Sequence, residues 1–178
     1  MRRTSILCSN RASGIGVCFT GEAWCRWLLE RAGALDVWLS GGRVCDPTAG
    51  EGAFALALCG MALERGAVLT DGLLERLSLI EIEPRFLEAF RREFRRRFGR
   101  DYPESSLHCQ DVITSPHPGT YDILVGNPPW ANFADLPDAY KEKLTPWFIR
   151  ENLTPPGEKL LLGGSRVDVA ALVLNSTL

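Results

Sequence analysis

The sequence has few of the residues that bind metal ions or build disulfide frameworks. It contains only two histidines, and its six cysteines include no C-x-x-C pair. A zinc knuckle and a disulfide-stabilised secreted domain are therefore not indicated, and no metal site is predicted. The scattered cysteines are typical of small buried thiols in a reducing compartment.

The chain also lacks long apolar runs and a large net charge. Its longest hydrophobic runs are too short to span a bilayer, and the opening MRRTSILCSNRASG turns polar before a signal-peptide core could form. A formal net charge of -2 gives no overall attraction to nucleic acid or to an anionic membrane. We therefore expect a cytoplasmic protein without membrane contact, in which a local patch or a missing region would hold any polyanion.

Strand patterns alternate with helical patterns along most of the chain, and 46% of the residues are hydrophobic. Residues 1–16 are polar and are expected to be loosely ordered. Strands are expected over 42–47, 76–84, 106–113 and 121–129, and helices over 20–33, 51–66, 84–99, 135–152 and 165–176. This alternation predicts an open, mostly parallel, doubly wound α/β sheet.

Parallel sheets bind ligands at the carboxyl ends of their strands, where the sequence places DPTAGEGAF. In this stretch Asp46 ends a strand, and Gly50 and Gly52 precede a helix whose amino terminus favours a carboxylate or a phosphate. Gly50-x-Gly52-x-x-Ala55 also fits the dinucleotide fingerprint, although that fingerprint usually has its first glycine directly at the strand end, where this chain has Asp-Pro-Thr-Ala. A glycine turn that only packs the helix on the strand is the third interpretation.

Acidic residues end the next two expected strands. Glu81 lies in the apolar strand LSLIEIEP, and alternation places it on the same face as Glu83. A carboxylate at a strand tip can accept both ribose hydroxyls, whereas solvated strand-end acids are the ordinary alternative. Asp111 could accept a hydrogen bond from an adenine amino group or could cap its own loop.

The stretch YDILVGNPPWANF runs an apolar strand into an asparagine, two prolines and a tryptophan. Proline fixes φ and restricts the preceding residue, so Asn127 and Pro128 are both expected to be rigid. The asparagine side-chain oxygen and the Pro128 carbonyl could jointly accept hydrogen bonds from one NH₂ group. Trp130 offers a flat apolar face for stacking on a base.

These motifs, in the order DPTAGEGAF, IEIEP, CQD and GNPPW, resemble those of class I S-adenosyl-methionine-dependent methyltransferases. They are most similar to the Rossmann-like enzymes that methylate adenine N6 in DNA, including those of restriction-modification and phage-defence systems. The similarity runs from about Val17 onward. It implies S-adenosyl-methionine as cofactor and Asn127, Pro128, Pro129 and Trp130 as the catalytic residues at the target base. The cofactor-binding residues that it implies are Thr20, Asp46, Pro47, Ala49, Gly50, Gly52, Glu81, Ile82, Asp111, Val112 and Asn127. In CFTGEAW, Gly21 stands where the family's early cofactor motif usually has proline.

The resemblance implies in-line transfer of the sulfonium methyl group to an amine nitrogen, without a metal ion or a strong general base. A target base within a duplex would be flipped out of the stack. RNA bases or a protein glutamine amide are alternative acceptors of the same chemistry. Two further alternatives are a nicotinamide oxidoreductase and a noncatalytic remnant that binds a partner.

The chain is shorter than such methyltransferases, which continue with three more strands and, in DNA-specific members, a target-recognition domain. We therefore expect 17–178 to be a partial, C-terminally truncated catalytic domain without target-recognition domain. Its last strand would form an apolar sheet edge that a partner chain could complete. DNA would then be bound mainly through regions or a subunit absent from this chain.

The arginine-rich stretch FRREFRRRFGR has two interpretations. Phe86, Phe90, Phe94 and Phe98 recur every fourth residue, which predicts one buried helix face and leaves the arginines on the other sides. A solvated helix face is the favoured interpretation, and a stripe that contacts the DNA backbone is the alternative.

Overall fold

The computed structural model describes residues 20–115, 119–153 and 168–177, which divide into two compact units. The sheet unit is Thr20–Asn127, and the C-terminal unit comprises the described residues 128–153 and 168–177. The division falls inside the Asn-Pro-Pro-Trp motif, directly after Asn127. The segment 1–16, predicted to be loosely ordered, lies outside the described residues.

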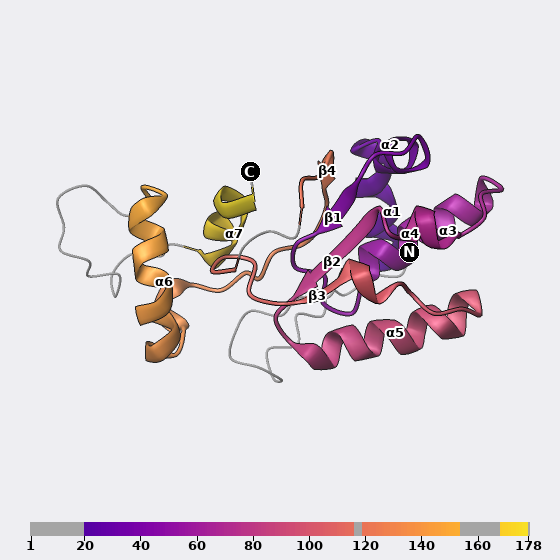
Figure 1. The fold of residues 1–178 in the computed structure, drawn as a ribbon. Helices are drawn as coiled ribbons and strands as arrows, with labels where there is room; N and C mark the ends of the chain where they lie inside the picture. The colour runs from indigo at the N-terminus through magenta and orange to yellow at the C-terminus, as the bar shows by residue number, and fades with distance from the viewer. Residues whose placement is uncertain (1–19, 116–118, 154–167, 178) are drawn as a thin grey trace, which may run out of the picture. The chain divides into compact units, whose positions relative to one another are not determined.

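The sheet unit is built on four parallel strands in the order β3-β2-β1-β4 (Figure 1). The strands are β1 (Val44–Asp46), β2 (Leu77–Glu81), β3 (Leu107–Cys109) and β4 (Ile123–Leu124). Val44 is paired with Leu77 on one side and with Ile123 on the other. The predicted parallel α/β sheet of Rossmann-like type is confirmed. The strand order reverses between β1 and β4, which is the topological switch point where open α/β sheets bind ligands.

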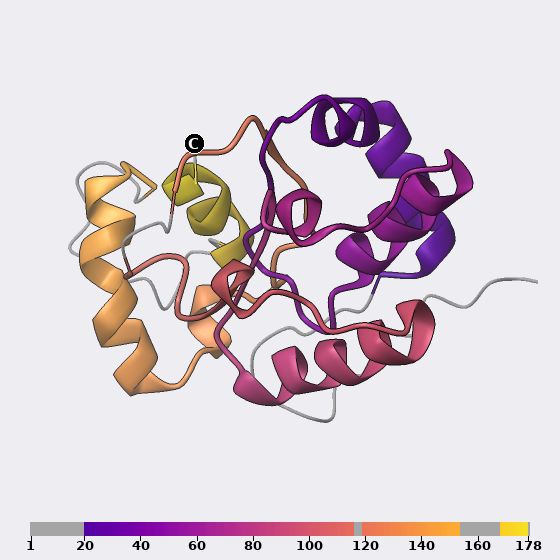
Figure 2. The same ribbon diagram turned by 45° about the vertical axis from the view of Figure 1, so that its right-hand side comes forward.

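The helices of the sheet unit form one layer with a shared hydrophobic core. They are α1 (Glu22–Arg31), α2 (Ala34–Leu39), α3 (Ala53–Glu64), α4 (Asp71–Leu74) and α5 (Pro84–Phe98). The crossovers through α3 and α5 step in the same direction along the sheet, so right-handed connections place both helices on one face. Figure 2 shows α5 running back from the end of β2. The return from β3 to β4 contains no helix in its described residues 110–115 and 119–122, so a doubly wound second layer stays a prediction.

The predicted first helix is confirmed, but its cap and its buried face differ from the expectation. Gly21, and not Thr20, is the N-cap, and Gly33 ends the run with a φ of 64°. The apolar repeat that predicted the helix contains Trp24 and Trp27, which are 58% and 48% exposed. Cys25 and Leu29 are buried instead, because packing against α3 selects the face.

The predicted phenylalanine face of α5 is confirmed at Phe90 and Phe94, whereas Phe86 and Phe98 are only half-buried. Phe90 and Phe94 are fully buried and pack on each other with ring centroids 5.6 Å apart. Five arginines of this stretch form ion pairs within the chain, whereas Arg92 is exposed and takes part in none of these pairs. These ion pairs join Arg91 to Glu104, Arg95 to Asp101, Arg96 and Arg97 to Glu93, and Arg100 to Asp71. Because nearby carboxylates neutralise these guanidinium groups, the geometry favours a solvated helix face over a stripe for the DNA backbone.

The C-terminal unit contains the short 3-10 helix η2 (Phe133–Asp135), α6 (Asp138–Arg150) and α7 (Val169–Thr177). The two predicted helices are present with shifted ends, and 165–167 lie outside the described residues. Phe133 packs edge-on against Phe148 at 5.1 Å. The amide of Val169 donates to the carbonyl of Ala131 at 2.9 Å, so the start of α7 is tied to the residue after Trp130.

None of the helices in the described ranges combines the length and the apolar character that crossing a membrane requires.

Candidate functional site

The carboxyl ends of β1 and β4 meet at the switch point around the side chain of Asp46. Asp46 is the last residue of β1 and is 1% exposed. A side chain at Gly126 would place its Cβ 2.7 Å from Oδ1 of Asp46 and 3.4 Å from Cδ of Pro47. Only glycine therefore allows this close approach. Sequence reasoning missed Gly126, although its position directly before Asn127 is a signal that could have found it.

The backbone amides of the loop after β1 donate hydrogen bonds to other groups of the chain. Thr48 N donates to Asp46 Oδ1 at 3.2 Å, and Gly50 N donates to Glu81 Oε2 at 2.7 Å. Ala49 N and Gly52 N donate to the carbonyls of Ile80 and Ala49, at 2.9 and 2.8 Å. A dinucleotide site presents such amides to a pyrophosphate. These four amides already have acceptors, and two of the acceptors are carboxylates that repel an anion.

Gly50 and Gly52 both have left-handed backbones but differ in their surroundings. Their φ values are 54° and 75°. A Cβ on Gly52 would lie 2.1 Å from the Phe90 ring, whereas a Cβ on Gly50 would have no atom within 4 Å. Gly52 is thus required for packing α3 against α5, as one interpretation of the glycine turn expected. Gly50 instead leaves open space beside Glu81.

Gly52→Ala and Gly50→Ala form a matched pair for a stability measurement. Both substitutions impose the left-handed strain of about 1–2 kcal/mol, but only Gly52→Ala also overpacks the core against Phe90, at a cost of about 1–3 kcal/mol. Urea unfolding should therefore show a larger loss for Gly52→Ala. Equal losses would contradict the packing role of Gly52.

Glu81, the last residue of β2, accepts a hydrogen bond from this loop and so stabilises it. Glu81 is 8% exposed, and its Oε1 accepts from Glu83 N at 2.9 Å while Oε2 holds Gly50. The expected alternation does not reach Glu83, because β2 ends at Glu81 and Glu83 is the N-cap of α5 with an ion pair to Arg85. Ile82 is 47% exposed at the same strand end and offers an apolar surface.

Asp46 and Glu81 are two buried carboxyl groups, and their negative charges repel each other when both are ionised. Burial raises the pKa of Asp46 to about 7, and the charge of Glu81 adds to this effect. The hydrogen bond from the Thr48 amide acts in the opposite direction and lowers the pKa. Burial also raises the pKa of Glu81, although the amides of Glu83 and Gly50 oppose this effect. Neither group draws a stabilising contribution from a Lys or Arg of the described chain. Such a pair favours a positively charged ligand, because ionised buried carboxylates are costly without a counter-charge.

Asp111 and Val112 lie past the end of β3, which stops at Cys109. Oδ1 of Asp111 accepts from Ile113 N and Oδ2 accepts from Thr114 Oγ1, both at 3.0 Å. Asp111 therefore caps its own loop, which was the alternative interpretation. Val112 is buried at 7% exposure. A contact of Asp111 with adenine stays a prediction.

Asn127 ends the sheet unit, and its side chain is held by a residue from the other end of that unit. Its Nδ2 donates to Oγ1 of Thr20 at 3.0 Å, across 107 positions of sequence. Thr20 and Asn127 are both half-buried. The structure thus joins the early motif to the Asn-Pro-Pro motif, a contact that no local pattern in the sequence indicated.

The remaining predicted site residues belong to the C-terminal unit. Pro128 and Pro129 are half-buried, and the amide of Ala131 closes a turn onto the Pro129 carbonyl at 3.1 Å. Trp130 is 60% exposed at the tip of this turn. A large exposed indole has the area and the flat face that stacking on a base requires.

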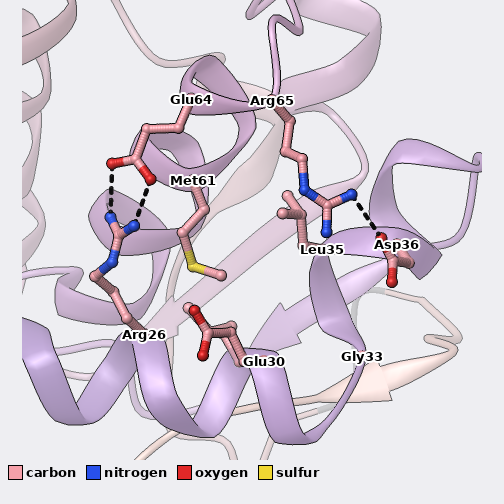
Figure 3. A pocket seen from close by; sticks show the side chains of 9 residues that line it. Arg26, Glu30, Gly33, Leu35, Asp36, Met61, Glu64 and Arg65 are labelled. Atoms are coloured by element: carbon pink, nitrogen blue, oxygen red, sulfur yellow. Dashed lines mark hydrogen bonds and ion pairs between the residues drawn. The ribbon is translucent and has the colours of Figure 1, made fainter.

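Within the described ranges, no group of three or more His, Cys, Asp or Glu side chains is arranged to hold a metal ion. A groove of about 440 Å³ lies between α1, α2 and the carboxyl end of α3, lined by none of the predicted site residues. Figure 3 shows its two ion pairs, Arg26 with Glu64 and Arg65 with Asp36. The groove lies at the far end of α3 from Gly52, and thus away from the switch point.

No protein-family model matches the chain, and comparison with curated proteins also gives no match.

Proposed function

We propose that this chain binds S-adenosyl-methionine and belongs to an amino methyltransferase that modifies the exocyclic N6 nitrogen of adenine in DNA. The observation that carries the proposal is the pair of buried carboxyl groups, Asp46 and Glu81, at the switch point of a parallel sheet. The supporting motif is Asn-Pro-Pro-Trp, which begins two residues after Val125 at the end of the same sheet.

The charge of the site supports a cationic ligand over a nucleotide phosphate. Asp46 and Glu81 offer negative charge, and the amides of Thr48 and Gly50 are already donated to these carboxylates. A pyrophosphate would meet repulsion without free donors there. S-adenosyl-methionine, when bound, supplies a methyl group on a positively charged sulfur that is also an excellent leaving group. This charge argument disfavours the nicotinamide alternative.

The surface at the end of β2 supports recognition of a nucleoside. The Glu81 carboxylate accepts from backbone amides, including those of Gly50 and Glu83, and its remaining lone pairs could accept from ribose hydroxyls. Ile82, the next residue along the chain, has an exposed apolar side chain. Gly50, with open space where a Cβ would stand, permits a ligand to approach the loop closely.

The role proposed for Asn127 is to accept a hydrogen bond from the amine that receives the methyl group. The amine lone pair of adenine is delocalised into the ring, so the free amine is a poor nucleophile. A side-chain oxygen of Asn127 and the carbonyl of Pro128 would both accept from the NH₂ group and draw its nitrogen toward tetrahedral geometry. Because proline restricts both residues, these acceptors are held in place before the amine arrives.

Calorimetric titration with S-adenosyl-methionine tests the proposal. Saturable binding is expected, and Glu81→Gln should weaken it at least about tenfold, because the charged acceptor for the ribose is lost. Glu83→Gln is the matched control, since Glu83 is two residues away and its carboxylate forms an ion pair with Arg85. A folded chain that binds NADH and not S-adenosyl-methionine would overturn the proposal.

The acceptor is identified by transfer of a labelled methyl group in three parallel reactions. The substrates are adenine-containing DNA, RNA of the same sequence and a glutamine-containing peptide. Labelling of DNA alone, with N6-methyladenine recovered after digestion, is the expected result. Labelling of RNA or of peptide would keep the cofactor assignment and overturn DNA as the acceptor.

A further inference from the structure

The outer side of α1 is an apolar surface that the described part of the chain leaves exposed. Trp24, Trp27 and Leu28 are 58%, 48% and 39% exposed, and the exposed Arg31 continues the same side at helical spacing. The two indoles meet edge to face, with ring centroids 5.9 Å apart. We call these four residues the tryptophan face. The opposite side of α1 packs against α3, so packing within the sheet unit does not explain the tryptophans.

The tryptophan face has the size of a protein contact site. A tryptophan side chain offers up to about 250 Å², so the exposed fractions of Trp24 and Trp27 leave roughly 250 Å² of indole in solvent. Leu28 and the carbon stem of Arg31 enlarge this area. Apolar patches of about 300–600 Å² are the largest on a typical monomer, and they often mark a site of interaction. Burial of this patch stays below the roughly 1,200–2,000 Å² of a stable complex, so a weak and reversible contact is expected.

The charges of α1 disfavour a polyanion as the partner of the tryptophan face. The helix carries two acidic residues, Glu22 and Glu30, and two basic residues, Arg26 and Arg31. A nucleic acid or an anionic membrane requires a surplus of Lys or Arg, which this helix lacks. The formal net charge of -2 is small enough for two copies of the chain to approach each other.

The order of residues on the tryptophan face suits a second copy of the same face. The positions 24, 27, 28 and 31 are symmetric about the point between Trp27 and Leu28. A two-fold axis through that point pairs α1 with an antiparallel copy, and the contact is then the same in both directions. Trp24 lies opposite the second copy's Arg31, and Trp27 lies beside the second copy's Leu28.

Arg31 supplies the specific element of this pairing. Its guanidinium lies over the ring of Trp27 in its own chain, 5.6 Å from the centroid. A guanidinium is planar and has two faces, so the outer face can stack on the indole of the second copy's Trp24. We infer that the tryptophan face joins two copies of this chain through antiparallel α1 helices. The contact requires neither a cofactor nor a reaction, so it stands or falls separately from the proposed function.

Sedimentation of the full chain from about 1 to about 300 µM tests the contact, and a monomer–dimer equilibrium with a Kd on the order of tens of micromolar is expected. Trp27→Lys should raise this Kd at least about tenfold, because a charge replaces a central indole. Val68→Lys is the matched control and should leave the Kd unchanged, since Val68 is 73% exposed and lies outside α1. Circular dichroism checks that each variant is folded. A chain that stays monomeric at the highest concentration, or a dimer that Trp27→Lys does not weaken, would overturn the inference.

The antiparallel register is tested by placing opposite charges at one position. Trp24→Glu puts a carboxylate opposite the second copy's Arg31, whereas Trp24→Arg puts a like charge there. Dimers of Trp24→Glu should therefore be at least about fivefold tighter than dimers of Trp24→Arg. The net charge acts in the opposite sense, because Trp24→Glu makes an already negative chain more negative. Equal affinities, or tighter dimers of Trp24→Arg, would overturn the antiparallel pairing.

Discussion

Asn127→Ala is expected to lower the rate of methyl transfer by about 10²- to 10³-fold. The substitution removes one of two acceptors that are held in place for the amine, and losing one preorganised polar group of this kind costs about that much in other group-transfer enzymes. Single-turnover transfer of a labelled methyl group at saturating S-adenosyl-methionine measures the effect. Cofactor binding should stay within about threefold, since Asp46 and Glu81 are unaltered.

Asn175→Ala is the matched control for this experiment. Asn175 is an exposed asparagine of α7 whose Nδ2 donates to Glu151 at 2.9 Å, and it belongs to none of the predicted motifs. The control should transfer at the unmodified rate. A rate for Asn127→Ala within threefold of the control would remove Asn127 from the proposed chemistry.

Asp46 is expected to make both stability and ligand affinity depend on pH. The folded chain holds the Asp46 proton up to a pKa of about 7, whereas an unfolded aspartate releases it near pH 4. Between these values the folded state binds more protons than the unfolded state. The free energy of unfolding of the ligand-free chain should therefore fall as pH rises from about 4 to about 7, by up to about 4 kcal/mol.

The expected loss of stability is read from urea unfolding at a series of pH values. Asp46→Asn should flatten most of the slope, because the amide does not titrate in this range. A smaller slope of the same sign should remain from Glu81, whose pKa is also raised by burial. An unmodified chain whose stability rises steadily from pH 4.5 to pH 7 would contradict the assignment of a raised pKa to Asp46.

Affinity for a cationic ligand should change in the opposite direction over the same range. S-adenosyl-methionine favours the ionised carboxylate, so its Kd should fall as pH rises from about 6 to about 8, by at most about tenfold per pH unit. Near pH 6.5 binding should release a proton, which calorimetry detects as a heat that differs between buffers of different ionisation enthalpy. A pH-independent Kd in the unmodified chain would exclude Asp46 as the counter-charge.

Much of the fold could be predicted because its signals are local. The apolar repeat of Phe90 and Phe94 predicted the buried face of α5, and the alternation of strands and helices predicted a parallel sheet. The local signal was misleading in α1, where exposed Trp24 and Trp27 carry the apolar repeat and Cys25 is buried. Helical periodicity identifies a helix, but the neighbouring elements choose which of its faces is covered.

The sequence by itself determined which residues follow the strands and that the Asn-Pro-Pro turn is stiff. Both depend on backbone preferences that act over a few neighbouring residues. Only the tertiary structure decided that a side chain at position 126 would collide with Asp46, and that a side chain at position 52 would collide with Phe90. It also decided the contact of Thr20 with Asn127, across 107 positions. These features depend on burial and on distances between remote segments, which the fold sets and which no local pattern encodes.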